Sequence, residues 1–237
     1  MTSLDEILSA CKAGDFRRAA GLIRENPSLA NQRNMLGSGP IHAAHFAGHQ
    51  PVVDLLLAYG VPLDVYLAAE LGRLDLIRGA LATDPKTAQA FNAAGNTALH
   101  CACYWGQVPA AHLLLDNGAD PNAPTRDTFL QIRPLGCAVA TPDVPNPSDR
   151  EEVVLELVGL LIAKGADVNG RRKDGLTPLH SAAYRGHLRV LDFLLAHGAD
   201  PALRGYDGAG PHAGQTALDL ATAQGQDAAA ELLAAPK

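Results

Sequence analysis

The chain has 237 residues, of which 47% are apolar and 19% are charged, and its mean hydropathy is +0.01. This is the composition of a folded globular protein, and it excludes a disordered or collagen-like chain. The formal net charge of −6 argues against a broad nucleic-acid surface, because phosphate binding needs clustered Lys and Arg.

The first predicted element along the chain is a helix with a recognisable start. Ser3 and Glu6 have the spacing of a capping box, in which each side chain bonds the backbone amide of the other residue. Gly14 is placed to end this helix, since glycine adopts the left-handed backbone that follows many helices. Glycines recur at the equivalent place along the chain, at Gly48, Gly72, Gly106, Gly186 and Gly225.

Three longer stretches can be aligned with one another, at residues 39–64, 97–122 and 177–202. Each begins with Gly or Thr, which is followed by Pro or Ala, then Leu or Ile, then His. Small residues, a glycine and an apolar run follow, and the stretch ends in a Gly-Ala-Asp-like sequence. The segment from Thr177, TPLHSA, closely resembles the T-P-L-H-x-A motif of the ankyrin repeat, which recurs about every 33 residues.

The resemblance to the ankyrin family implies an all-α solenoid of helix-turn-helix units with short β-turn hairpins, curved with a concave face. One unit cannot bury its own apolar face, so neighbouring units must stack. We predict a single domain of about six repeats over residues 1–237, degenerate and capping copies included. The predicted boundaries are about 3–34 (N-terminal capping repeat), 35–64, 65–91 (shortened), 92–123, 124–170, 171–203 and 204–237 (C-terminal capping repeat).

Three of these copies depart from the pattern. The shortened copy at 65–91 has lost most of its hairpin, because Gly48 and Gly72 are only 24 residues apart. The copy at 124–170 carries a proline-containing insertion near 141–149, which could be a contact surface or a neutral insertion. The glycine-rich segment 205–214 is expected to be an extended hairpin rather than a nucleotide-binding loop.

The segment IHAAHFAGH places three histidines within eight positions, at His42, His45 and His49, and imidazole is a common metal ligand. In the repeat register, however, a glycine precedes His49 and breaks the helix that a shared histidine face would need. The resemblance implies that His42, His100 and His180 hold the hairpins through hydrogen bonds, together with Thr97 and Thr177. We therefore predict no metal site, while His45 has no assigned role.

No sequence motif of a catalytic or cofactor site is present: there is no GxSxG, no phosphate-binding loop and no GxGxxG. We expect a non-enzyme without a cofactor or small-molecule substrate. The four cysteines lack disulfide or zinc spacing, and no signal peptide or 18-residue apolar span is present, so we expect no membrane association and a cytoplasmic location. The cysteines, expected to be buried, are Cys11, Cys101, Cys103 and Cys137.

The residues that the repeat does not require indicate a binding surface. In the family, the two positions before the helix-ending glycine face the concave groove, and we call them the pre-glycine pairs. Here they are rich in aromatic residues, which dominate interface hot spots. The predicted partner-binding residues are Phe46, Glu70, Leu71, Tyr104, Trp105, Tyr184 and Arg185, with Phe129, Leu130 and Tyr206 at hairpin tips.

We therefore predict a non-catalytic protein-protein interaction module whose partner is an unidentified protein. Three alternatives stay open at this point. The aromatic rings could instead pack against neighbouring repeats. The chain could be a metal-dependent enzyme that uses the histidines of 42–49. It could also be an effector or accessory protein from a bacterium, since Arg exceeds Lys and Ala, Pro and Gly are abundant.

Overall fold

The computed structural model describes residues 3–33, 39–140, 147–208 and 210–235. Over these residues it contains fourteen α-helices, two 3-10 helices and no strand, and the one isolated β-bridge joins Phe91 to Thr97. The predicted all-α class is therefore confirmed. The first helices of the pairs are α1 (Leu4–Lys12), α3 (Pro40–Phe46), α5 (Val65–Glu70), α7 (Ala98–Tyr104), α9 (Pro134–Val139), α11 (Pro178–Arg185) and α13 (Ala217–Ala223).

Each first helix is followed by a second helix of the same repeat. The described helices form seven pairs, one for each predicted range and one more than the count of about six. The second helices are α2 (Phe16–Glu25), α4 (Gln50–Ala58), α6 (Leu74–Thr83), α8 (Val108–Asp116), α10 (Pro147–Ala163), α12 (Leu188–Ala196) and α14 (Asp227–Ala234). The 3-10 helices η1 (Pro27–Asn31) and η2 (Pro85–Gln89) follow α2 and α6.

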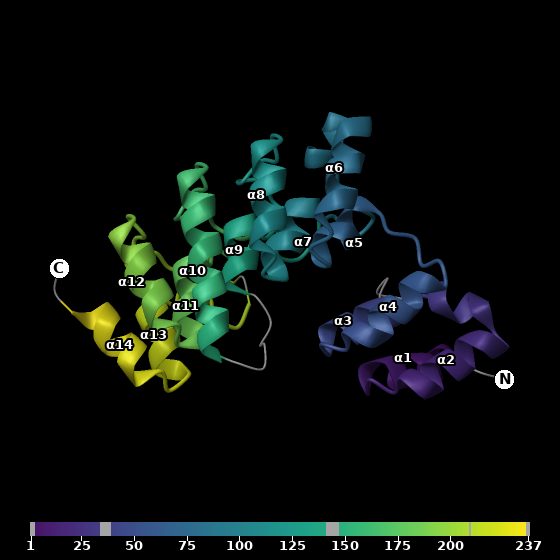
Figure 1. The fold of residues 1–237 in the computed structure, drawn as a ribbon. Coiled ribbons are helices and arrows are strands. Elements are labelled where there is room, and N and C mark those ends of the chain that lie inside the picture. Colours follow the sequence, from purple (N-terminus) through teal and green to yellow (C-terminus); the bar gives the residue numbers. More distant parts are fainter. Residues whose placement is uncertain (1–2, 34–38, 141–146, 209, 236–237) are drawn as a thin grey trace. The chain divides into compact units, whose positions relative to one another are not determined.

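The chain divides into two compact units, Met1–Asp64 and Val65–Lys237. In the first unit, α1 packs on α3 and α2 packs on α4. In the second unit, α5, α7, α9, α11 and α13 pack in succession to form one row of first helices, and α6, α8, α10, α12 and α14 form a parallel row of second helices (Figure 1). Each unit thus has the two-row arrangement that stacked helix pairs produce.

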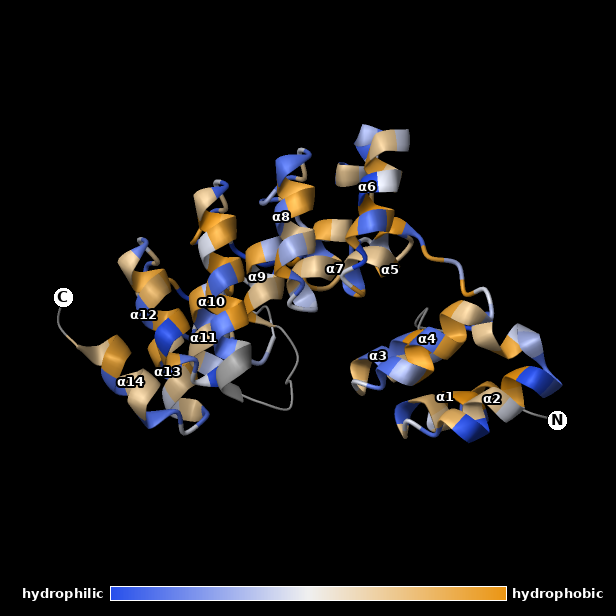
Figure 2. Ribbon diagram, viewed as in Figure 1, coloured by the Kyte–Doolittle hydropathy of each residue, from blue (hydrophilic) through white to orange (hydrophobic). Residues whose placement is uncertain are grey.

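The core lies between the two rows, where the repeat motif supplies a buried aliphatic side chain at the same place in four copies. Ile41, Leu99, Leu135 and Leu179 follow the Pro or Ala that opens their first helices, and all are at most 2% exposed. In the second unit the turns that end α8, α10 and α12 are hydrophilic, whereas apolar residues predominate along the helices (Figure 2). Burial of these aliphatic side chains is the main force that holds neighbouring repeats together.

The glycines that end the first helices allow the following repeat to approach closely. Gly72 has a φ of +67°, and a Cβ there would lie 2.5 Å from Oε1 of Gln107 in the next repeat. The side-chain amide of Gln107 also donates to the backbone carbonyl of Glu70 at 3.1 Å. In the first unit, His49 covers Gly14 in the same way and contacts the carbonyl of Lys12 through Nε2 at 3.2 Å.

Asparagine side chains join consecutive repeats of the second unit at the opposite end of the helix pairs. Asn122 donates to the carbonyl of Gly165 at 2.8 Å and accepts from the amide of Asp167 at 2.7 Å. Asn169 makes the same two bonds one repeat further on, to Gly198 and Asp200. Each asparagine side chain therefore provides hydrogen-bond partners for one backbone carbonyl and one backbone amide of the next repeat.

The predicted insertion near 141–149 falls mostly on residues 141–146, which lie outside the described residues. The helix that follows, α10, spans 17 residues and is longer than the second helices of the other repeats described. Glu151 of α10 accepts a hydrogen bond from the backbone amide of Arg189 at 3.0 Å, and Glu152 forms an ion pair with the Arg189 side chain. The extra length of α10 thus supplies an acceptor to an amide in the first turn of α12 that has no partner within its own helix.

Candidate binding surface

The pre-glycine pair of α7 presents two aromatic rings. Tyr104 ends α7 with 36% of its surface exposed, and Trp105 follows as the C-terminal cap and is half-buried. The two rings meet edge to face, with their centroids 5.6 Å apart. Such a contact holds both rings in fixed positions while it leaves the outer face of Tyr104 accessible.

The pre-glycine pair of α11 combines an aromatic ring with a cation. Tyr184 is 43% exposed, and its ring lies edge-on to the ring of His212, with 5.8 Å between centroids. Arg185 is half-buried and donates to the carbonyl of Ala140 at 3.2 Å, at the C-terminal end of α9. Arg185 therefore ties two repeats together, in addition to any contact with a partner.

The pre-glycine pair at the end of α5, Glu70 and Leu71, is less exposed than expected. Glu70 is only 7% exposed, and Leu71 is half-buried. The cause is local: α5 has six residues and packs directly on α7, and Gln107 of the next repeat bonds the backbone of Glu70. The expectation that the Glu70 side chain faces solvent is therefore wrong.

In the first unit, the corresponding position is occupied by Phe46. It is the last residue of α3, and 63% of its surface is exposed.

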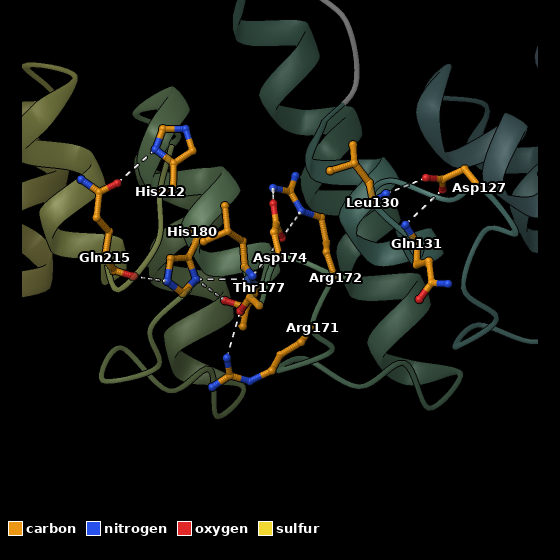
Figure 3. A network of polar contacts seen from close by, with 12 residues as sticks. Asp127, Leu130, Gln131, Arg171, Arg172, Asp174, Thr177, His180, His212 and Gln215 are labelled. Carbon is orange, nitrogen blue, oxygen red and sulfur yellow. Dashed lines mark hydrogen bonds and ion pairs between the residues drawn. The ribbon is translucent and has the colours of Figure 1, made fainter. Parts of the chain in front are cut away.

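The turn over residues 125–132 holds an exposed apolar pair in a fixed backbone. Asp127 accepts hydrogen bonds from the backbone amides of Leu130 and Gln131 at 2.6 and 3.0 Å (Figure 3). It also accepts from the backbone amide of Phe129 at 2.8 Å and from the hydroxyl of Thr125. These bonds lower the pKa of the Asp127 carboxyl to about 2, although burial opposes the shift. The result is a turn in which the Phe129 ring is 82% exposed and Leu130 is 38% exposed.

Tyr206, the remaining predicted contact, lies in the hairpin of the last repeat. Its ring is 49% exposed and lies below the guanidinium of Arg171, 5.1 Å from the ring centroid. Its backbone amide donates to the carbonyl of Asp174 at 2.9 Å. The preceding hairpin therefore fixes the position of Tyr206.

The repeat histidines are part of the framework of the hairpins. Nδ1 of His100 accepts from the amide and the hydroxyl of Thr97, at 3.1 and 2.7 Å, and Nε2 lies 3.1 Å from the carbonyl of Ile132 in the next repeat. His180 makes the equivalent contacts with Thr177 and with the carbonyl of Gln215 (Figure 3). Burial lowers the pKa of both, to about 4 for His100, so both rings are neutral at pH 7.

His42 occupies the same helix position in the first unit, but the N-terminal cap of its helix is Gly39 instead of a threonine. Its Nδ1 accepts from the amide of Gly39 at 3.1 Å, and burial lowers its pKa. The helix that carries His42 and His45 ends at Phe46, and His49 precedes the next helix as its N-terminal cap. Across the part of the chain that the structure describes, no group of three His, Cys, Asp or Glu side chains is arranged to hold a metal ion.

The cysteines are thiols in apolar surroundings. Cys11, Cys103 and Cys137 are buried, and Cys101 is half-buried. Burial raises the pKa of Cys11 to about 11, that of Cys137 to about 12, and that of Cys103 well above its usual value. These three thiols are therefore weak nucleophiles, because the thiolate is the reactive form.

Within the described ranges, no helix combines the length and the apolar character needed to cross a bilayer.

Comparison with known families agrees with the paired helices. A family model described as ankyrin repeats (3 copies) matches residues 7–125 and 151–237. The chain belongs to the ankyrin-repeat family. Ankyrin repeats are generally protein-protein interaction modules and are typically non-catalytic.

The relatives are ankyrin-containing proteins of several kinds. A probable E3 ubiquitin-protein ligase, XBOS32 of Oryza sativa subsp. japonica, is 27% identical over 82% of this chain and 38% of its own length. The nuclear factor NF-kappa-B p105 subunit of Gallus gallus is 30% identical over 76% of this chain and 18% of its own. The serine/threonine-protein kinase TNNI3K of Mus musculus is 32% identical over 60% of this chain and 16% of its own.

The chain thus spans less than two-fifths of the length of each of these relatives. They come from plants and animals, so they give no support to a bacterial source.

Proposed function

We propose that this ankyrin-repeat chain is a non-catalytic module that binds a partner protein through the pre-glycine surface of its second unit, defined as Tyr104, Trp105, Tyr184 and Arg185. The observation that carries the proposal is the exposure of Tyr104 and Tyr184 at equivalent positions of two repeats. Nothing in the repeat motif requires an aromatic residue at these positions, since Ala223 occupies the same position in the last copy.

The geometry of the surface favours binding over simple packing. Tyr and Trp bury a large area and lose few rotatable bonds on binding. The edge-to-face contact of Tyr104 with Trp105 already restricts both rings, which lowers the entropic cost of association. Arg185 is tied to the Ala140 carbonyl and stiffens the same face.

Further contacts are proposed at Phe46 in the first unit, and at Phe129, Leu130 and Tyr206 on hairpins of the second. Glu70 is omitted because its side chain is buried. Leu71, half-buried, is kept as a peripheral contact. We also propose a cytoplasmic location, since buried cysteine thiols suit a reducing compartment. An effector or accessory role stays a second proposal. The composition bears on the source alone, since an excess of Arg over Lys and abundant Ala, Pro and Gly suit a bacterium.

The test compares capture of proteins from native lysate by the intact chain and by a Tyr104→Ala/Trp105→Ala variant. We expect the partner to be retained by the intact chain and lost by the variant. For an isolated partner, Trp105→Ala should weaken binding by about 2 kcal/mol, close to 30-fold in Kd. Tyr59→Ala is the matched control, because Tyr59 is 38% exposed but caps a second helix.

Unfolding must be measured in parallel. If Trp105→Ala leaves binding unchanged and lowers the melting temperature strongly, the rings serve to pack the repeats, and the proposed surface is wrong. Trp105→Phe, which keeps the edge-to-face contact, should retain most of the stability and part of the binding.

A further inference from the structure

A second surface of the second unit has the properties of a peptide-binding groove. A shallow groove of about 450 Å³ lies between the turn at residues 91–95 and the turn at residues 126–129. Phe91 lines one side and Phe129 the other. The guanidinium of Arg126 stacks over the Phe91 ring, 3.8 Å from its centroid. The groove therefore combines two aromatic rings with one cation.

Arg126 differs in its pairing from most of the other arginines on the hairpins. Arg133, Arg172 and Arg204 each form an ion pair with an aspartate, and Arg171 donates to backbone carbonyls. Arg126 is exposed, and no carboxylate among the described residues forms an ion pair with it. Its positive charge is thus available to a ligand.

The carboxylate of Asp127 also borders the groove and would repel an anion. Both of its oxygens, however, accept hydrogen bonds from its own turn, two from the amides of Phe129 and Leu130 and two from Gln131 and Thr125. These four donors stabilise the Asp127 carboxylate within its own turn. Arg126 supplies the positive charge that an incoming carboxylate would meet.

The walls of the groove are held in place before any ligand arrives. The amide of Arg126 donates to the carbonyl of Gly95 at 2.8 Å, so the two turns are joined directly. The turn at residues 126–129 is also bonded to the next hairpin. Nζ of Lys173 donates to the carbonyl of Thr128 at 2.6 Å, and the backbone amide of Lys173 donates to the carbonyl of Leu130 at 2.8 Å. Gln131 adopts a φ of +51°, a left-handed conformation that the surrounding hydrogen bonds sustain. An aromatic ring on such a fixed turn loses little entropy on binding.

We propose that this groove binds a peptide segment in which an Asp or Glu side chain stands beside an apolar or aromatic side chain. The carboxylate pairs with Arg126, which a guanidinium can do through two parallel hydrogen bonds. The apolar side chain covers the Phe129 ring, which is 82% exposed in the free chain. The groove uses no residue of the pre-glycine surface, so either surface can fail its test while the other stands.

The first experiment identifies the ligand class without assuming a sequence. A random peptide library displayed on phage is selected against the intact chain, and in parallel against Arg126→Gln and Phe129→Ala variants. We expect the intact chain to enrich peptides with Asp or Glu next to Phe, Trp or Leu, and each variant to lose them. Enrichment of peptides without acidic residues, or enrichment that survives both substitutions, overturns the proposal.

The second experiment locates and measures the binding. The ¹⁵N-labelled chain is titrated with acetyl-Asp-Phe-amide and with acetyl-Asn-Phe-amide while the backbone amide signals are followed. The acidic peptide should shift the signals of residues 91–95 and 126–130, with a Kd at least about 10-fold lower than that of the neutral peptide. Added salt should weaken the acidic peptide alone.

The control variant is Arg78→Gln, which removes an exposed arginine from α6 and should leave the titration unchanged. The melting temperature of Arg126→Gln verifies that this variant is folded. If the signals of residues 91–95 and 126–130 do not move, or if the two peptides bind equally to the intact chain and to Arg126→Gln, the groove is not a site for acidic peptides.

Discussion

At the scale of single residues, the buried histidines link the sequence motif to the solution behaviour of the protein. His100 is 2% exposed and His180 is 1% exposed, and each has both ring nitrogens engaged while neutral. A proton on Nδ1 would remove the acceptor for the threonine amide and place a charge in an apolar site. The motif that fixes the hairpin therefore also makes it sensitive to acid.

We expect the stability of the chain to fall as the pH drops below about 6.5. The pKa of His100 is about 4 in the folded chain and near 6.5 when unfolded, so the unfolded state binds more protons between these values. The stabilisation is complete above pH 6.5 and is lost progressively toward pH 4, by up to about 3 kcal/mol for His100. Urea unfolding at a series of pH values measures it.

The carboxylates affect stability in a lower pH range than the histidines, so the two effects can be measured separately. The pKa of Asp127 is lowered to about 2, and those of Asp174 and Asp219 are also lowered, so their contributions are lost only as the pH falls below about 4. His100→Gln is the matched variant, and it should flatten the dependence between pH 4 and 6.5. An unchanged slope in that variant would assign the effect to other groups.

At the scale of helices and turns, several features could be predicted from the sequence and others could not. The short interval between Gly48 and Gly72 predicts the reduced third repeat, because the number of residues limits what the turn can contain. The burial of Glu70 was missed, since it depends on how closely α5 approaches α7 after the hairpin is lost. The exposure of Phe129 follows from its place on a hairpin tip, but the four bonds to Asp127 depend on the three-dimensional path of the turn.

The sequence contains a recurring signal for the contacts between repeats. The residue after the helix-ending glycine can donate a hydrogen bond in four copies, as His49, Gln107, His187 and Gln226. The structure places His49, Gln107 and Gln226 against the glycine of the preceding repeat. In sequence, this recurrence distinguishes His49 from a metal ligand without reference to the end of the helix.

The asparagine bonds between repeats give a prediction at the same scale. Replacing Asn122 with Ala removes one donor to Gly165 and one acceptor for Asp167, and we expect a loss of about 1–2 kcal/mol in the free energy of unfolding. Asn117→Ala is the control, because its side chain donates to the carbonyl of Leu113 within its own repeat and makes no other hydrogen bond to the described residues. Chemical denaturation compares the two, and an equal loss would contradict a specific role for the contact between repeats.

At the scale of the whole molecule, stability is distributed along the array. In a repeat protein each unit contacts only its neighbours, so the free energy of folding approximates a sum of local terms. The division into Met1–Asp64 and Val65–Lys237 falls where the hairpin of the third repeat is missing. Each unit has fully buried aliphatic side chains of its own, so the core of either one can be altered separately.

We therefore expect a core substitution in one unit to unfold that unit selectively. Ile7 is fully buried on α1, and Ile7→Ala should destabilise by about 2–5 kcal/mol. Amide hydrogen exchange should then be faster over residues 3–64 while residues 65–235 keep their protection. Leu194→Ala on α12, also fully buried, is the reciprocal control and should affect the second unit. A uniform loss of protection in both variants would show that the chain unfolds as one cooperative body, against this expectation.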